Sequence, residues 1–72
     1  MEFTPDKFEL ALILWDHGIF LASHFHMDGE RNSLYKYNKR FYVIWYDKDN
    51  QLDKVETVSE DVAKKIFEDY VF

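Results

Sequence analysis

The sequence predicts a small two-layer α+β domain over residues 1–72, with the element order α-β-β-β-β-α. In this arrangement a three- to four-stranded antiparallel meander packs against two helices. Two patterns predict it: apolar residues recur at helical spacing near both ends of the chain, and aromatic or β-branched residues dominate its middle. A third observation is length, because 72 residues provide for only one hydrophobic core.

The first predicted helix opens at Thr4 and Pro5 and ends near Asp16 or His17. The threonine hydroxyl can cap the helix, and proline loses no hydrogen bond at the first helical position. Gly18 follows where a left-handed residue often ends a helix. Residues that favour the start and the end of a helix therefore flank this segment on both sides.

This helix is apolar on two sides. One side carries Phe8, Ala11, Leu12 and Trp15, and the other carries Leu10, Ile13 and Leu14. Such a helix is expected to lie between the sheet and another helix, or against a second subunit. Leu10, Ile13 and Leu14 are therefore a candidate dimer face.

Short polar turns divide the middle of the chain into strands. The predicted strands cover residues 19–27, 32–37, 40–46 and a weaker edge strand at 52–58. Asp28-Gly29 and Asn38-Lys39 are expected to form tight hairpin turns, since these residue types tolerate positive φ. The result is an antiparallel meander.

A second helix is expected after the meander. Ser59 is its predicted N-cap, and Thr57 with Glu60 forms an alternative capping box. Its apolar half contains Val62, Ala63, Ile66, Phe67, Tyr70 and Val71. This pattern is typical of a surface helix with one buried side.

The two hairpin turns predict a register in which Ser23 faces Leu34 and Leu34 faces Val43. One sheet face then collects the core residues Ile19, Leu21, Phe25, Leu34, Phe41, Val43 and Trp45. The opposite face is aromatic, and many of its side chains end in a polar group.

We predict a partner-binding surface on this opposite face, formed by Phe20, His24, His26, Tyr35, Tyr37, Tyr42 and Tyr46. Tyrosine and histidine suit interfaces because each joins an apolar body to a hydrogen-bonding end. The alternative is that a terminal helix covers this face.

Composition narrows the classes of partner. A net charge of −5 disfavours nucleic acid and anionic membrane surfaces and favours a basic protein partner. The longest apolar run, residues 10–15, is far shorter than a membrane span. The chain has no cysteine and no signal-peptide pattern at its start, so a cytoplasmic location is expected.

Catalytic and metal chemistry have weak support in the sequence. His24 and His26 would project from one strand face, with Asp28 as a conceivable third ligand, but two histidines are few for a metal site. Ser33 opposite His24 is the one arguable nucleophile and base pair, and it lacks a third group. We therefore expect no enzyme activity, no metal and no cofactor.

A binding function is the remaining expectation. The sequence favours a non-enzymatic protein-interaction module with a regulatory, inhibitory or immunity-type role, and it leaves a homodimer open. The alternative is single-stranded nucleic-acid binding, in which Lys36, Lys39 and Arg40 lie beside the tyrosine-rich sheet face.

Overall fold

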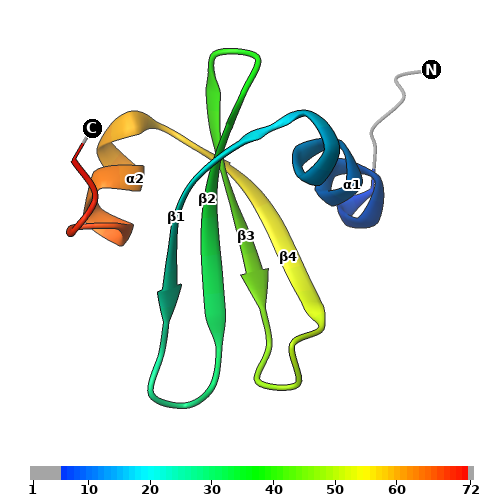
Figure 1. The fold of residues 1–72 in the computed structure, drawn as a ribbon, viewed down its shortest axis with the longest axis vertical. Coiled ribbons are helices and arrows are strands. Elements are labelled where there is room, and N and C mark those ends of the chain that lie inside the picture. Colours follow the sequence, from blue (N-terminus) through cyan, green and yellow to red (C-terminus); the bar gives the residue numbers. More distant parts are fainter. Residues whose placement is uncertain (1–5, 72) are drawn as a thin grey trace.

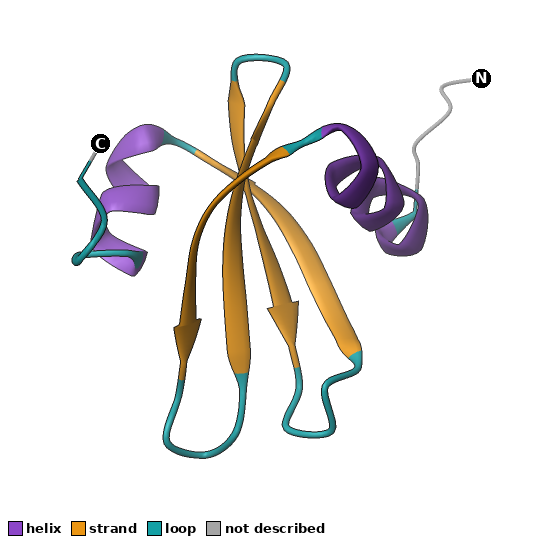
Figure 2. Cartoon of the chain, in the orientation of Figure 1, coloured by secondary structure: helices purple, strands orange, loops and turns teal. Residues whose placement is uncertain are grey.

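The computed structural model describes residues 6–71. The elements in chain order are α1 (Lys7–His17), β1 (Ile19–Phe25), β2 (Arg31–Tyr37), β3 (Arg40–Tyr46), β4 (Leu52–Val58) and α2 (Glu60–Ile66). The strands form one antiparallel sheet in the order β1-β2-β3-β4, as Figure 2 shows. The α+β class and the predicted order of elements are confirmed.

The two helices lie on opposite sides of the twisted sheet (Figure 1), so the fold has three layers rather than the predicted two. The physical reason is that both faces of the central strands are apolar. Helix α1 covers a cluster that includes Tyr42 and Ile44, whereas α2 covers a cluster that includes Leu34 and Val43. Each face therefore needs its own cover to remove it from water.

The turns follow the residue chemistry that predicted them. Asn38 and Lys39 have φ angles of 51° and 65°, the positive values of a type I′ hairpin turn. Gly29 has a φ of 95° in the β1–β2 turn. The Asp28 carboxylate accepts a hydrogen bond from the Glu30 amide at 2.9 Å in the same turn.

Strand β1 departs from the predicted register. Leu34 pairs with Val43 as predicted, but it faces Ala22 on its other side, and Ser23 faces Ser33. A bulge between Phe20 and Ala22 inserts the extra residue that causes this shift. Side chains of β1 beyond the bulge consequently point to the face opposite the predicted one.

Helix α1 begins at Lys7, and its cap is Asp6, whose carboxylate accepts a hydrogen bond from the Glu9 amide at 2.9 Å. The predicted opening at Thr4 and Pro5 lies outside the described residues. Gly18 is extended, with a φ of −75°, and not left-handed as predicted. Glycine is needed there because a Cβ atom would lie 2.6 Å from the Leu14 carbonyl oxygen.

Helix α2 is shorter than its apolar pattern predicted. Ser59 is the N-cap, as predicted, and its hydroxyl accepts a hydrogen bond from the Val62 amide at 3.2 Å. The helix ends at Ile66, and the chain then turns so that Phe67 and Tyr70 still pack on the sheet. No helix within residues 6–71 is long and apolar enough to cross a membrane.

Candidate functional site

The predicted tyrosine-rich face exists, but α1 covers much of it. The members of the predicted surface that share this face are Phe20, Tyr35, Tyr37, Tyr42 and Tyr46. Tyr42 and Tyr46 are only 8% and 9% exposed, because they pack with Ala11 and Leu14 of α1. The centre of the predicted surface is therefore part of the core. This outcome matches the alternative given above, in which a terminal helix covers this face.

The two histidines do not join this face. Because of the β1 bulge, His24 lies opposite Asn32 and not opposite Ser33. On the α2 side its ring centre lies 5.1 Å from that of Phe67, with the two rings tilted by 49°. Its Nε2 lies 3.9 Å from a carboxylate oxygen of Asp69. His26 lies beyond the end of β1. No group of three or more His, Asp or Glu side chains within residues 6–71 is placed to hold a metal ion.

The predicted dimer face of α1 is turned inward. Leu14 is fully buried, and Leu10 is half-buried against the same cluster. Ile13 is half-buried as well. Leu10 and Leu14 therefore hold α1 to the sheet. Ala11, which was predicted on the other side of the helix, is buried with them, whereas Phe8, Leu12 and Trp15 of that side are exposed.

The largest exposed apolar side chains near α1 come from two elements. Phe8, Leu12 and Trp15 of α1 are 58%, 54% and 45% exposed, and Phe20 and Phe25 of β1 are 56% and 78% exposed. We call these five residues the aromatic surface. The α1 members lie three or four residues apart, so they form one stripe along the helix.

A chain of contacts joins the stripe on α1 to β1. The Trp15 indole donates a hydrogen bond to the Tyr46 hydroxyl at 3.0 Å. The Arg31 guanidinium lies 4.1 Å from the centre of the Tyr46 ring and 5.9 Å from that of Phe25. The two halves of the aromatic surface are thus connected through Tyr46 and Arg31.

Arg31 lacks the partner that a half-buried cation usually has. Its Nε atom is buried and has no hydrogen-bond acceptor among the residues that the structure describes. Arg31 takes part in no ion pair with a carboxylate of residues 6–71. The predicted strand began at residue 32, so Arg31 was not predicted to lie in the sheet, and its missing acceptor was not predicted either.

Tyr35 extends this cluster toward the edge of the sheet. Its ring meets the Phe20 ring edge-on, with 5.6 Å between the ring centres. Burial raises the pKa of Tyr35 above its ordinary value of 10.0, the nearby Tyr46 raises it further, and Arg31 opposes the shift. Tyr35 therefore stays neutral at physiological pH and acts as an apolar support with a hydrogen-bonding tip.

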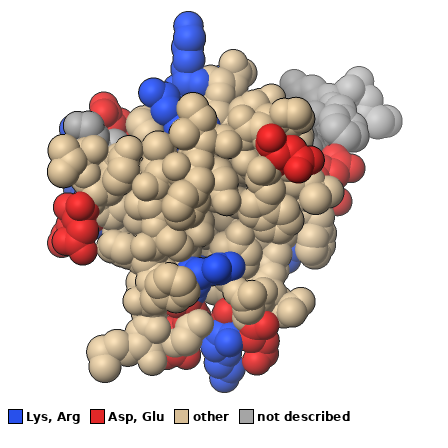
Figure 3. Space-filling model, viewed as in Figure 1, with Lys and Arg blue, Asp and Glu red and all other residues tan. Residues whose placement is uncertain are grey.

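Acidic side chains border the aromatic surface. Glu9 and Asp16 are exposed on α1, three and four residues from Leu12, and helical spacing places them beside it. Asp28 and Glu30 are exposed in the turn between Phe25 and β2. Figure 3 shows a face of the molecule with charged side chains mainly around its margin and uncharged side chains over most of its centre.

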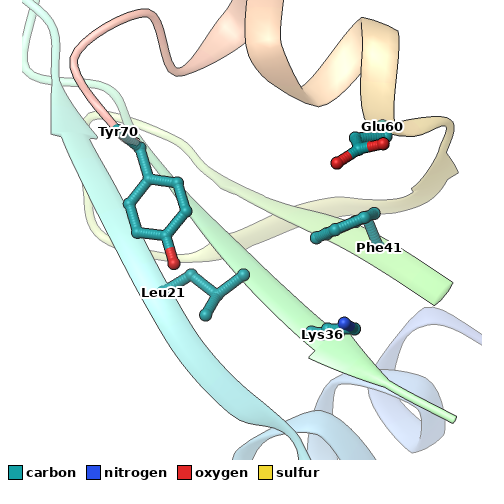
Figure 4. A pocket seen from close by; sticks show the side chains of 5 residues that line it. All are labelled: Leu21, Lys36, Phe41, Glu60 and Tyr70. Carbon is teal, nitrogen blue, oxygen red and sulfur yellow. The ribbon is translucent and has the colours of Figure 1, made fainter. Parts of the chain in front are cut away.

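A small cavity lies on the other side of the sheet, beneath α2. It measures about 210 Å³ and is lined by Leu21, Lys36, Phe41, Glu60 and Tyr70 (Figure 4). The Tyr70 hydroxyl points toward Leu21, and Glu60 lies near Phe41. Pockets for drug-sized ligands usually measure about 300–1,000 Å³. This cavity is below that range.

Two buried polar groups lie side by side on the same α2-facing side. Asn32 is 1% exposed, and neither side-chain amide atom has a hydrogen-bond partner among residues 6–71. Its cross-strand neighbour Trp45 has a buried indole N–H that also lacks an acceptor in this part of the chain. No residue pattern predicted this pair, because an asparagine in a strand is ordinary polar alternation and its neighbour Trp45 lies on another strand.

The basic residues of the alternative nucleic-acid surface do not share one face. Lys36 pairs with Phe41 on the α2 side, where its amine lies 5.6 Å from the centre of the Phe41 ring. Lys39 lies in the hairpin turn, and Arg40 is exposed beside Tyr37 on the α1 side. Helix α1 also occupies the middle of the tyrosine-rich face on which bases would stack.

Comparison with known proteins gives no relative from which a function could be inferred. No protein-family model matches the chain, and no match was found among curated proteins or solved structures.

Proposed function

We propose that the protein is a non-enzymatic interaction module that binds another protein through the aromatic surface. The observation that carries this proposal is the exposure of Phe8, Leu12 and Trp15 on α1 and of Phe20 and Phe25 on β1, two elements that the contacts of Tyr46 and Arg31 connect. Exposing five large apolar side chains on neighbouring elements of so small a domain is unfavourable unless a partner covers them. Aromatic residues are also enriched at the centres of protein interfaces.

The charge around the surface favours a basic partner. Glu9, Asp16, Asp28 and Glu30 lie along its border, and the chain has a net charge of −5. A partner with an apolar centre and a basic margin would therefore be attracted at long range and matched on contact. In a symmetric pair of identical chains, the same patch would meet itself. Its acidic margins would then lie close together and repel, so we propose a different protein rather than a second copy.

The biological role that suits this arrangement is to mask a basic surface of the partner protein. A small acidic domain that covers a basic surface can act as a regulator, an inhibitor or an immunity-type protein. The small cavity under α2 and the separation of His24 from Ser33 agree with a function by binding rather than by catalysis.

The proposal can be tested by site-specific photocrosslinking in the native host. A photoreactive phenylalanine analogue is placed at Leu12 and, separately, at Phe20. The matched control carries the analogue at Lys65, an exposed position of α2 on the other side of the sheet. We expect both test positions to give the same crosslinked protein and the control position to leave it uncrosslinked.

The captured protein is then purified and its affinity measured. Replacing Leu12 or Phe20 by Asp should weaken binding at least about tenfold, and added salt should slow association because the margins are oppositely charged. Equal crosslinking from all three positions would contradict the proposal. Crosslinks between copies of the chain, with a dimer in analytical ultracentrifugation that Leu12→Asp dissociates, would identify a second copy as the occupant instead.

A further inference from the structure

We infer that Arg31 is a receptor for a carboxylate, supplied by an acidic side chain that apolar residues flank on the partner protein. The inference rests on the proposed function and specifies the chemistry at the middle of the interface. It places one acidic group of the partner between Phe25 and Tyr46, inside the partner's basic margin.

The first argument is that Arg31 has an unused, buried hydrogen-bond donor. Arg31 is half-buried, and within residues 6–71 its buried Nε–H finds no acceptor and no carboxylate forms an ion pair with it. Burying a polar group is unfavourable unless an opposite charge or hydrogen bonds replace the lost hydration. Contacts with the Tyr46 and Phe25 rings replace only part of it.

The second argument concerns geometry. The guanidinium lies 4.1 Å from the Tyr46 ring centre, so the ring limits the orientations that the guanidinium can adopt. An arginine restrained in this way loses little further freedom when it binds, and its planar donors match the two oxygens of a carboxylate. A lysine would offer the same charge without this planar match.

The third argument identifies the surroundings of the carboxylate. Trp15 is connected to Arg31 through Tyr46, and the Phe25 ring centre lies 5.9 Å from the guanidinium. A carboxylate that reaches Arg31 must therefore approach between exposed apolar side chains. Apolar residues next to the acidic one would cover those side chains, exclude water and strengthen the ion pair.

The test uses two tripeptides that differ in one group. The probe is acetyl-Phe-Asp-Phe-amide, and the control is acetyl-Phe-Asn-Phe-amide, which has the same shape without the charge. Both are titrated into the full chain labelled with ¹⁵N, and the arginine Nε–H and tryptophan indole signals are followed by NMR. The chain has two arginines and two tryptophans, so Arg40 and Trp45 serve as internal controls away from the site.

We expect the Asp peptide to shift the Arg31 and Trp15 signals in a saturable way and to leave those of Arg40 and Trp45 in place. The Asn peptide should bind about tenfold more weakly, because it cannot form a charge-assisted hydrogen bond. In Arg31→Gln the two peptides should bind equally, whereas Arg40→Gln should keep the difference. The comparison of the two peptides with the unaltered chain needs no variant, so it holds even if Arg31→Gln folds poorly.

Two outcomes would overturn the inference, and they separate it from the proposed function. If both peptides shift Trp15 equally without moving Arg31, the apolar docking surface stands and the carboxylate receptor does not. If neither peptide shifts Trp15 or Arg31, the carboxylate receptor is wrong, and the aromatic surface must then be judged by the crosslinking experiment alone.

Discussion

The Trp15 indole donates a 3.0 Å hydrogen bond to the Tyr46 hydroxyl, and this contact joins helix α1 to the third strand of the sheet. Tyr46 is 9% exposed and Trp15 is 45% exposed, so the bond lies at the boundary between the core and the aromatic surface. The bond therefore fixes the orientation of Trp15 at the edge of the core.

We expect Trp15→Phe and Tyr46→Phe each to lower the free energy of unfolding by about 1 kcal/mol, the usual contribution of one hydrogen bond. Because both variants remove the same bond, the double variant should cost less than the sum of the two single variants. Urea denaturation of all four proteins measures this coupling. Strictly additive losses would show that the bond does not form in solution.

Leu14 and Leu12 provide a matched test of which side of α1 faces the core. Leu14 is fully buried, so Leu14→Ala should lower the free energy of unfolding by about 2–5 kcal/mol. Leu12 is 54% exposed, so Leu12→Ala should change it by no more than about 0.5 kcal/mol. Thermal or urea denaturation distinguishes the two. Similar losses of unfolding free energy for both variants would mean that the stripe of Phe8, Leu12 and Trp15 on α1 is also covered, for example by a second copy of the chain.

The raised pKa of Tyr35 predicts a loss of stability at high pH. Burial, the first cause of the shift, disfavours the phenolate, so the folded chain keeps this proton more tightly than the unfolded chain does. The stability contribution is fully present below the ordinary pKa of 10.0 and is lost as pH rises through the raised value. Urea denaturation between pH 9 and pH 12 should show a smaller decline for Tyr35→Phe than for the parent. Identical declines would assign the pH dependence to other groups.

Gly18 is expected to resist substitution for a steric reason. A Cβ atom there would lie 2.6 Å from the Leu14 carbonyl oxygen, although the φ of −75° suits any residue. Gly18→Ala should therefore lower the free energy of unfolding by about 1–3 kcal/mol through displacement of the end of α1. Asp16→Ala, two residues earlier and exposed, is the control and should have almost no effect. A neutral Gly18→Ala would show that the helix end shifts without cost.

The local elements were well determined by the sequence. The asparagine and lysine at 38 and 39 adopt the positive φ of the predicted hairpin turn, and Ser59 caps α2 as predicted. Strands β3 and β4 have the bounds that their residue patterns predicted. These features depend on residues close together in the chain, so turn chemistry, capping and alternation were sufficient to predict them.

The assignment of surfaces was less predictable, since it depends on contacts between distant residues. A single bulge before Ala22 moved His24 to the α2 side, and no residue pattern in β1 marks that bulge. Two apolar sides of α1 were predicted, but the sequence could not tell which residues would meet the sheet, and Ala11 is buried with Leu14 rather than exposed with Leu12.

The sequence by itself determined the α+β class, the order of the elements and the aromatic character of one sheet face, because each follows from local periodicity. Only the tertiary structure decided that α1 and α2 take opposite faces and that Tyr42 and Tyr46 become core. It also decided that the Arg31 Nε–H has no acceptor among residues 6–71. The helices take opposite faces because apolar surface on both sides of the sheet must be buried. Within residues 6–71 two helices serve that purpose, and they leave the outer stripe of α1 and the phenylalanines Phe20 and Phe25 of β1 exposed.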